Sequence, residues 1–319
     1  NRTEDATIAT PAKGEAEPAP WSLKPARLGL RAVLAMGSGS LIAAFYIGTG
    51  DIAIATQMGA RFGFKLWWTY FIVGIAGWAL IDMSVRYFLR FGRTPMSIFK
   101  EVHPVFTVYM FLAAVVCALV GSYSQWNACA MVVTTVLPGV PVEVCGALAA
   151  AAGLLFLTTG AYNRLERFFV VGLILLIVCV FGSAIVAGFD WRDAAGGLVP
   201  NAPGEGWRPL FVSNAGSMIN AWLILIYPYT MIERGWFSKR LQGKVNILRR
   251  ARFDYAWGIV AGAVVALPLM AAANAVARPF GIVPRNHTDL SMLLEPLAGS
   301  ASTALFLGGL FLAAWTSGV

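Results

Sequence analysis

Charged residues are scarce in this chain. Asp, Glu, Lys and Arg make up 13% of its 319 residues, whereas 58% are hydrophobic. A soluble domain carries about 25% charged residues, so a soluble enzyme or binding domain does not fit this composition. The few charges lie in short joints between long apolar blocks. This arrangement is typical of an all-α polytopic membrane protein.

Metal ligands that contain nitrogen or thiol sulfur are also few. The chain has 2 His and 4 Cys, and the cysteines lie inside apolar segments without C-x-x-C spacing. Such cysteines are typically small buried hydrophobes. We therefore expect no disulfide framework, no zinc centre, no histidine-built metal site and no cofactor.

The net charge of +8 raises the possibility of a nucleic-acid partner, but the basic residues lie between apolar blocks rather than along one soluble face. Positive residues gather on the cytoplasmic side of membrane proteins. With a cytoplasmic N-terminus, the 24 Lys and Arg fall on the inner side except for Arg61, Lys65, Arg192, Arg208, Arg278 and Arg285. We predict a multi-pass plasma-membrane protein of the bacterial inner-membrane type, with its N-terminus in the cytoplasm.

The apolar blocks predict about eight transmembrane helices, since a hydrocarbon core takes roughly 20 helical residues. They cover residues 30–60, 64–90, 104–136, 144–159, 166–187, 209–236, 255–277 and 298–319. Residues 1–28 are polar and rich in Ala and Pro. They predict a disordered cytoplasmic tail rather than a signal peptide, which needs an apolar core.

Two of these blocks carry helix-breaking residues. The first contains the glycines of Gly48–Gly50, and the sixth contains Pro228. Glycine permits non-helical backbone and proline lacks a donor, so either block can be an interrupted helix or a kinked continuous one. Breaks five helices apart are typical of an inverted repeat that binds substrate at the unwound points. The repeats would span 29–188 and 189–319, the second incomplete.

Asp51 follows the glycines directly. A carboxylate facing lipid at membrane depth costs about 2.5–3.5 kcal/mol, so Asp51 is expected to face a cavity. Freed carbonyls at Gly48–Gly50 and this carboxylate would suit a cation. Alternatively, Asp51 caps a half-helix that begins at Ile52. The two roles are compatible.

The stretch GSGSLIAAFYIGTGDIAIATQMGARFGFKLWW resembles the first helix of the NRAMP family of divalent-metal transporters. The segment RFGRTPMSIFKEVHP is similar to the basic loop after the family's second helix. The resemblance implies a LeuT-like inverted-repeat fold with broken helices 1 and 6. It also implies alternating access at a site between those two helices.

The resemblance also locates substrate-binding positions, several of which are altered here. The family's Asp-Pro-Gly-Asn falls on Gly48, Thr49, Gly50 and Asp51, so Asp51 becomes the carboxylate and the implied metal ligand. The family's Ala and Met fall on Ile224 and Tyr227. The resemblance therefore implies that Asp51, the backbone of Gly48, Thr49 and Gly50, and carbonyls near Ile224 bind the substrate, with Tyr227 shaping the cavity.

Further polar and sulfur-bearing residues each have two interpretations. Asn214 and Asn220 either line the cavity or hydrogen-bond across helices. Met58, Met218 and Met231 either supply a thioether, which favours transition metals, or pack as ordinary apolar residues.

Acidic positions that the family uses for proton movement fall on or near Tyr123 and Trp126. This predicts weak or absent proton coupling. Asp82 and Arg86, four residues apart, predict an internal ion pair, with a proton relay through Asp82 as the alternative.

The main hypothesis is a secondary transporter or facilitator of a divalent cation of the Mg or Mn class, with the bilayer as surroundings and no nucleic-acid partner. The same scaffold could instead carry a non-metal small solute or a monovalent ion. A non-transporting sensor would share these sequence features. An intramembrane aspartyl protease, suggested by Gly-x-Gly-Asp, needs a second aspartate on a preceding helix. Only Asp82 is available and it follows the motif, so we predict no enzyme.

Overall fold

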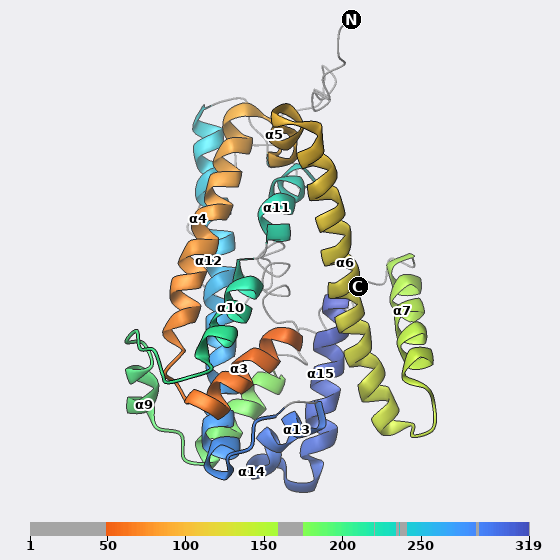
Figure 1. Cartoon of the computed structure of the whole chain (residues 1–319), viewed down its shortest axis with the longest axis vertical. Coiled ribbons are helices and arrows are strands. Elements are labelled where there is room, and N and C mark those ends of the chain that lie inside the picture. Colours follow the sequence, from red (N-terminus) through yellow and green to blue (C-terminus); the bar gives the residue numbers. More distant parts are fainter. Residues whose placement is uncertain are drawn as a thin grey trace, which may run out of the picture.

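The computed structural model of this chain describes residues 49–158, 175–219, 221–233, 236, 241–284 and 287–318. All regular structure in these residues is helical (Figure 1). The predicted tail over residues 1–28 lies outside the described residues, as do Gly48 and Asn220 of the predicted site.

Four helical stretches are long and apolar enough to cross a membrane by length and composition: Trp68–Phe91, Pro104–Val136, Gly243–Phe280 and Asp289–Trp315. Two shorter apolar helices cover Val142–Leu155 and Leu175–Val186. These helices support the prediction of a polytopic membrane protein. The total of eight transmembrane helices stays a prediction.

Two long helices, α4 (Trp68–Phe91) and α12 (Leu241–Ala272), lie side by side (Figure 1). Three shorter helices pack against them: α3 (Thr49–Phe62), α10 (Trp207–Met218) and α11 (Ala221–Glu233). This group of five helices contains both polar sites described below.

A second group of helices is built around α6 (Pro104–Val136), which packs against α7 (Val142–Thr158) and α15 (Ser302–Gly318). The short helix α5 (Pro95–Val102) connects α4 to α6 at one end of the molecule, and α9 (Trp191–Gly196) lies toward the other end (Figure 1). The remaining short elements are η1 (Ala273–Ala277), η2 (Arg278–Phe280), α13 (His287–Ser291), η3 (Met292–Leu294), α14 (Glu295–Ala298) and η4 (Gly299–Ala301).

Glycines allow α12 to approach its neighbours closely. A Cβ atom added to Gly59 of α3 would lie 2.4 Å from the carbonyl oxygen of Met270, and one on Gly74 of α4 would lie 2.5 Å from a methyl group of Ile259. Helices that meet through small residues in this way bring their backbones together. The walls of the site described below are therefore held by direct helix contact.

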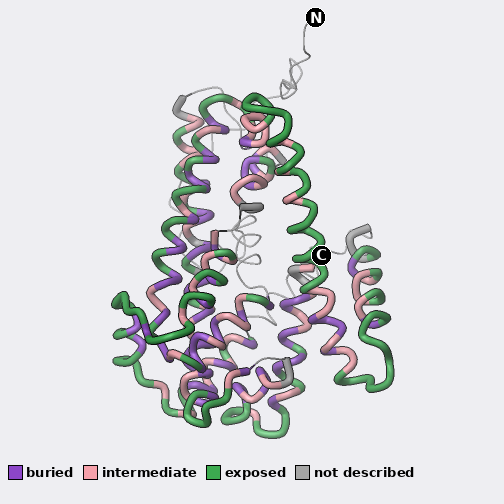
Figure 2. Tube along the Cα trace, in the orientation of Figure 1, coloured by how far each residue is buried: buried purple, intermediate pink, exposed green. Residues whose placement is uncertain are grey.

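Buried residues gather where these helices meet, and the outer face of α6 is exposed over most of its length (Figure 2). Many exposed side chains on α6 are large and apolar, for example Phe111 and Leu119. In a membrane, lipid rather than protein covers such a face, so this exposure agrees with a polytopic membrane protein.

The sequence predicts a helix interruption near Pro228, but the structure has its non-helical backbone at another position. Pro228 is inside α11, whereas the non-helical backbone occurs at Ile219 (φ −93°, ψ 62°), between α10 and α11. Proline deprives the carbonyl four residues earlier of its helical donor. That carbonyl belongs to Ile224, and the Ser84 hydroxyl donates to it over 2.8 Å. A side chain from α4 thus supplies a partner for the carbonyl that Pro228 leaves without a helical donor.

Two other helix boundaries also differ from the predicted ones. The seventh block was predicted to begin at residue 255, but α12 covers Leu241–Ala272 and so includes much of the basic joint between the blocks that end at residue 236 and begin at residue 255. This joint is rich in Leu, Lys, Arg and Gln, which are good helix formers. In addition, α3 already includes Thr49, Gly50 and Asp51, so the alternative of a half-helix that begins at Ile52 is wrong.

Candidate functional site

Asp51 lies in the first turn of α3. A carboxylate is favoured at this end of a helix by the positive end of the helix dipole. The Ser217 hydroxyl, near the C-terminal end of α10, donates a hydrogen bond to Oδ1 of Asp51. The carboxylate is therefore held where the beginning of one helix meets the end of another.

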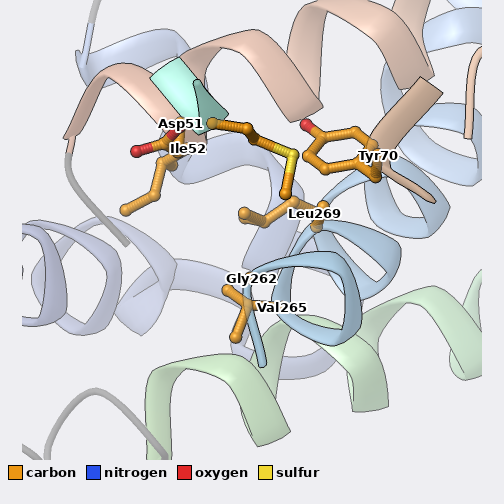
Figure 3. A pocket seen from close by; sticks show the side chains of 8 residues that line it. Asp51, Ile52, Tyr70, Gly262, Val265 and Leu269 are labelled. Carbon is orange, nitrogen blue, oxygen red and sulfur yellow. The ribbon is translucent and has the colours of Figure 1, made fainter. Parts of the chain in front are cut away.

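A small cavity adjoins Asp51 and is formed by four helices. Its lining residues are Asp51, Ile52, Tyr70, Met218, Gly262, Val265, Ala266 and Leu269 (Figure 3). The space open to the centre of a water-sized molecule is about 10 Å³. This is at the lower limit for holding one water molecule, so the cavity suits a single small species rather than an organic solute.

The lining of the cavity combines one carboxylate, one thioether and one phenol with otherwise apolar groups. Carboxylate oxygen binds most divalent ions, whereas thioether sulfur favours transition metals. Of the three methionines considered from sequence, Met218 lines the cavity, while Met58 and Met231 are fully buried core residues. The geometry therefore favours Met218 as the source of sulfur.

The other predicted site residues lie apart from this lining. The Thr49 hydroxyl donates to Oε1 of Gln125 on α6 over 3.0 Å, and Gly50 is exposed. The carbonyl of Ile224 accepts from Ser84, as described above. Neither Ile224 nor Tyr227 is among the residues that line the cavity with Asp51.

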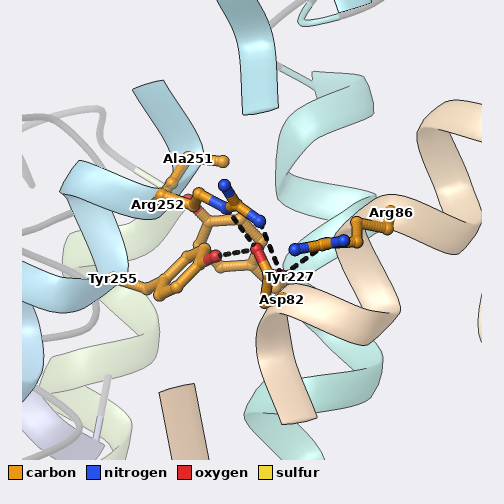
Figure 4. A network of polar contacts seen from close by, with 6 residues as sticks. All are labelled: Asp82, Arg86, Tyr227, Ala251, Arg252 and Tyr255. Carbon is orange, nitrogen blue, oxygen red and sulfur yellow. Dashed lines mark hydrogen bonds and ion pairs between the residues drawn. The ribbon is translucent and has the colours of Figure 1, made fainter. Parts of the chain in front are cut away.

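A second polar cluster is centred on Asp82 of α4 (Figure 4). Its carboxylate accepts from Arg86 Nε at 2.6 Å, from Arg252 Nε at 2.7 Å and from the Tyr255 hydroxyl at 2.6 Å. The predicted pair of Asp82 and Arg86 is confirmed. Two cations and a phenol surround one buried carboxylate, so this cluster joins α4 firmly to α12.

Tyr227 belongs to the edge of this second cluster. Its hydroxyl donates to Oδ2 of Asp254 over 2.9 Å, and its ring packs edge-on against Tyr255 with centroids 5.7 Å apart. Tyr70 and Asp82 are separated by 12 positions on α4, which is about 18 Å at the rise of an α-helix. Tyr227 thus connects α11 to the Asp82 cluster and not to the cavity beside Asp51.

Asn214 makes the interhelical contact that was one of its two interpretations. Its side-chain amide donates to the Thr69 hydroxyl over 3.0 Å, which links α10 to α4. Sequence reasoning did not identify Ser217 or Tyr70 as site residues. Neither residue lies in a recognisable motif, and only the packing of α10 against α3 and α4 brings them to Asp51.

Comparison with known proteins agrees with this architecture. The profile of the family described as "Natural resistance-associated macrophage protein-like" (Nramp) matches residues 39–319. The chain belongs to this family. The resemblance inferred from the first helix is therefore confirmed over most of the chain.

Two relatives of this Nramp-family chain are divalent-metal transporters by name. The divalent metal cation transporter MntH of Burkholderia ambifaria is 26% identical over 330 residues, covering 99% of this chain and 71% of that protein. The divalent metal cation transporter MntH 1 of Pseudomonas aeruginosa is 25% identical over 296 residues, covering 89% and 66%. These relatives are transporters and not enzymes, in agreement with the prediction.

Among solved structures, the manganese transporter of Eremococcus coleocola, in complex with an aromatic bis-isothiourea substituted compound, matches with a TM-score of 0.68 at 15% identity. The match covers 89% of this chain and 62% of that one. It shows the fold, which is that of a multi-pass membrane protein. The chain thus spans between 62% and 71% of the length of these three proteins.

Proposed function

We propose that this protein is a secondary transporter or facilitator of a divalent cation of the manganese class. The observation that carries the proposal is the cavity in which the carboxylate of Asp51 and the thioether of Met218 lie together between four helices. The names of the relatives support a metal substrate.

The ligand types favour manganese over magnesium. Mg²⁺ prefers oxygen ligands in near-octahedral geometry and gives up its water slowly. A cavity of one-water size with a sulfur atom in its wall suits a softer ion that sheds water more readily. Of the two predicted classes, we therefore favour Mn²⁺ over Mg²⁺.

We further propose that transport follows alternating access, with the Asp82 cluster on the cytoplasmic side of the cavity. With the predicted N-terminus inside, the end of the molecule that carries α5 faces the cytoplasm. The Asp82 cluster lies between the cavity and that end and ties α4 to α12. Opening toward the cytoplasm would require these contacts to loosen. The inverted repeats and the bacterial inner membrane belong to the same proposal.

Weak or absent proton coupling is also part of the proposal. The helix α6 contains Tyr123 and Trp126 and has no Asp, Glu or His between Pro104 and Val136. Tyr123 is exposed on this helix. A proton relay along α6 would therefore have no carboxylate or imidazole to use.

One observation favours an alternative substrate, a monovalent cation. Among the described residues, no group of three or more His, Cys, Asp and Glu gathers in one place. A single carboxylate neutralises one charge, which matches a monovalent cation better than a divalent one. The thioether in the same cavity supports the divalent transition metal instead.

The test is calorimetric titration of the purified full chain in lipid nanodiscs with Mn²⁺ and Mg²⁺, followed by ion uptake into proteoliposomes. We expect Mn²⁺ binding that is lost in Asp51→Asn and weakened at least tenfold in Met218→Leu. The control is Met83→Leu, since Met83 is an exposed methionine on α4. A folded wild type that binds neither ion, or an Asp51→Asn variant that binds Mn²⁺ normally, would overturn the proposal.

A further inference from the structure

Tyr70 of α4 has an unusual hydroxyl group. The residue is 3% exposed, and its hydroxyl oxygen has no hydrogen-bond partner in the described part of the chain. The same residue lines the cavity beside Asp51 and Met218. Figure 3 shows the hydroxyl end of the ring directed toward the side on which Asp51 lies.

A buried hydroxyl without a partner is unfavourable, because it has lost its hydrogen bonds to water. Phenylalanine would fill the same space without that cost. The neighbouring polar residue Thr69 is fully engaged, since its hydroxyl donates to the carbonyl of Leu66 at 2.6 Å and accepts from Asn214. The Thr69 hydroxyl is thus already engaged with other groups.

We propose that Tyr70 is a positioning residue for the transported ion. Its hydroxyl hydrogen-bonds a water molecule that stays bound to the ion while Asp51 and Met218 contact the ion directly. The cavity has room for this one water molecule, and the ion would then lie at the edge of the cavity beside Asp51. The inference rests on the proposed function and extends it to ions that retain a water ligand.

This role gives Tyr70 an effect on specificity. An ion that depends on oxygen ligands, such as Mn²⁺, loses a stabilised water ligand when the hydroxyl is removed. A soft ion such as Cd²⁺ takes more of its binding energy from the thioether. Tyr70 would therefore favour Mn²⁺ over Cd²⁺ in this cavity.

The test compares Tyr70→Phe with the wild type and with Tyr109→Phe, which removes the hydroxyl of an exposed tyrosine on α6. Calorimetric titration of the full chain in nanodiscs should show Mn²⁺ affinity reduced about tenfold in Tyr70→Phe, equivalent to about 1.4 kcal/mol. Cd²⁺ affinity should change less than threefold. Both affinities should be unchanged in Tyr109→Phe.

A second measurement separates this role from a structural one. Water-proton relaxation of the Mn²⁺ complex reports the waters bound to the ion, and we expect a loss or faster exchange of bound water in Tyr70→Phe. Wild-type Mn²⁺ binding with an unchanged affinity and relaxation in Tyr70→Phe would overturn this inference alone. A wild type that binds no metal would overturn the proposed function and this inference with it.

Discussion

Asp51 and Asp82 are two carboxylates on consecutive helices, α3 and α4, with different surroundings. Asp82 is buried and accepts from two arginines and a tyrosine. The residues that line the cavity beside Asp51 include no Lys or Arg, and one of them, Tyr70, has a hydroxyl unpaired among the described residues. A carboxylate saturated with donors holds helices together, whereas one beside a cavity without cations can still attract a cation. The contrast agrees with the proposal that Asp82 has a structural role and Asp51 a binding role.

The largest loss of stability is expected for Asp82→Ala. Removing one partner of a buried ion pair costs about 3–5 kcal/mol. We expect the lower end of that range, because the side chains of Arg252 and Arg86 are 34% and 59% exposed and water can reach them. Chemical unfolding in detergent, followed by tryptophan fluorescence, measures the change.

The matched control is Arg86→Gln, which should cost less than about 1 kcal/mol because an exposed ion pair contributes little. If Asp82→Ala unfolded at the same denaturant concentration as the wild type, the Asp82 cluster would not hold α4 to α12.

The next largest effect is expected for Tyr227→Phe. The change removes a hydroxyl that donates to the buried carboxylate of Asp254. A hydrogen bond to a charged group contributes about 1.5–3 kcal/mol, so unfolding should occur at a lower denaturant concentration. Mn²⁺ affinity should stay unchanged, since Tyr227 does not line the cavity. The control is Tyr123→Phe, which removes the hydroxyl of an exposed tyrosine. A loss of Mn²⁺ binding in Tyr227→Phe would show that Tyr227 belongs to the binding site.

Gly59→Ala tests whether the cavity depends on the close approach of α3 to α12. The added methyl group would meet the backbone of Met270, and overpacking of this kind costs about 1–3 kcal/mol. Because α3 carries Asp51, we expect weaker Mn²⁺ binding as well as lower stability. In Gly121→Ala, inside α6, the methyl group enters open space. Mn²⁺ affinity should match the wild type, and stability should be equal to it or, through helix propensity, higher by up to about 1 kcal/mol. Normal Mn²⁺ affinity in Gly59→Ala would show that the cavity tolerates movement of α3.

The smallest effect on stability is expected for Ser217→Ala, which removes the hydroxyl that donates to Asp51. A hydrogen bond to a charged group contributes about 1.5–3 kcal/mol, and we expect the lower end of that range because this bond is only part-buried and water can replace the lost donor. Loss of a partner that orients a metal ligand weakens metal affinity by about 10–100-fold. Calorimetry should show a tenfold loss for Mn²⁺ and near-normal binding in Ser217→Thr, which keeps a hydroxyl. Equal binding by all three proteins would mean that Asp51 needs no orientation by α10.

Patterns within one helix or one block predicted much of this protein. The apolar blocks indicated long membrane helices, the spacing of Asp82 and Arg86 indicated their ion pair, and the first helix indicated the family. Pro228 shows where such patterns fail. The missing donor was visible in sequence, but the Ser84 hydroxyl that satisfies the carbonyl of Ile224 lies 140 positions away. A helix break was therefore expected where a side chain from α4 allows the helix to continue.

The candidate site was predicted only in part for the same reason. Asp51 was identified because a carboxylate that faces lipid costs free energy, so its presence in an apolar block indicates a cavity or a partner. Its expected neighbours Ile224 and Tyr227 followed from alignment to the family's sixth helix, yet the non-helical backbone occurs at Ile219. The residues beside the cavity from this segment are consequently Ser217 and Met218.

The sequence by itself determined that this protein belongs in a membrane, that it belongs to the Nramp family and that Asp51 is a residue in need of a partner. Only the tertiary structure decided which groups meet that carboxylate. Hydropathy and spacing act along the chain, whereas the cavity is made where α3, α4, α10 and α12 cross. The contact of Ser217 with Asp51 joins positions 166 residues apart, and no pattern within a single helix specifies such a contact.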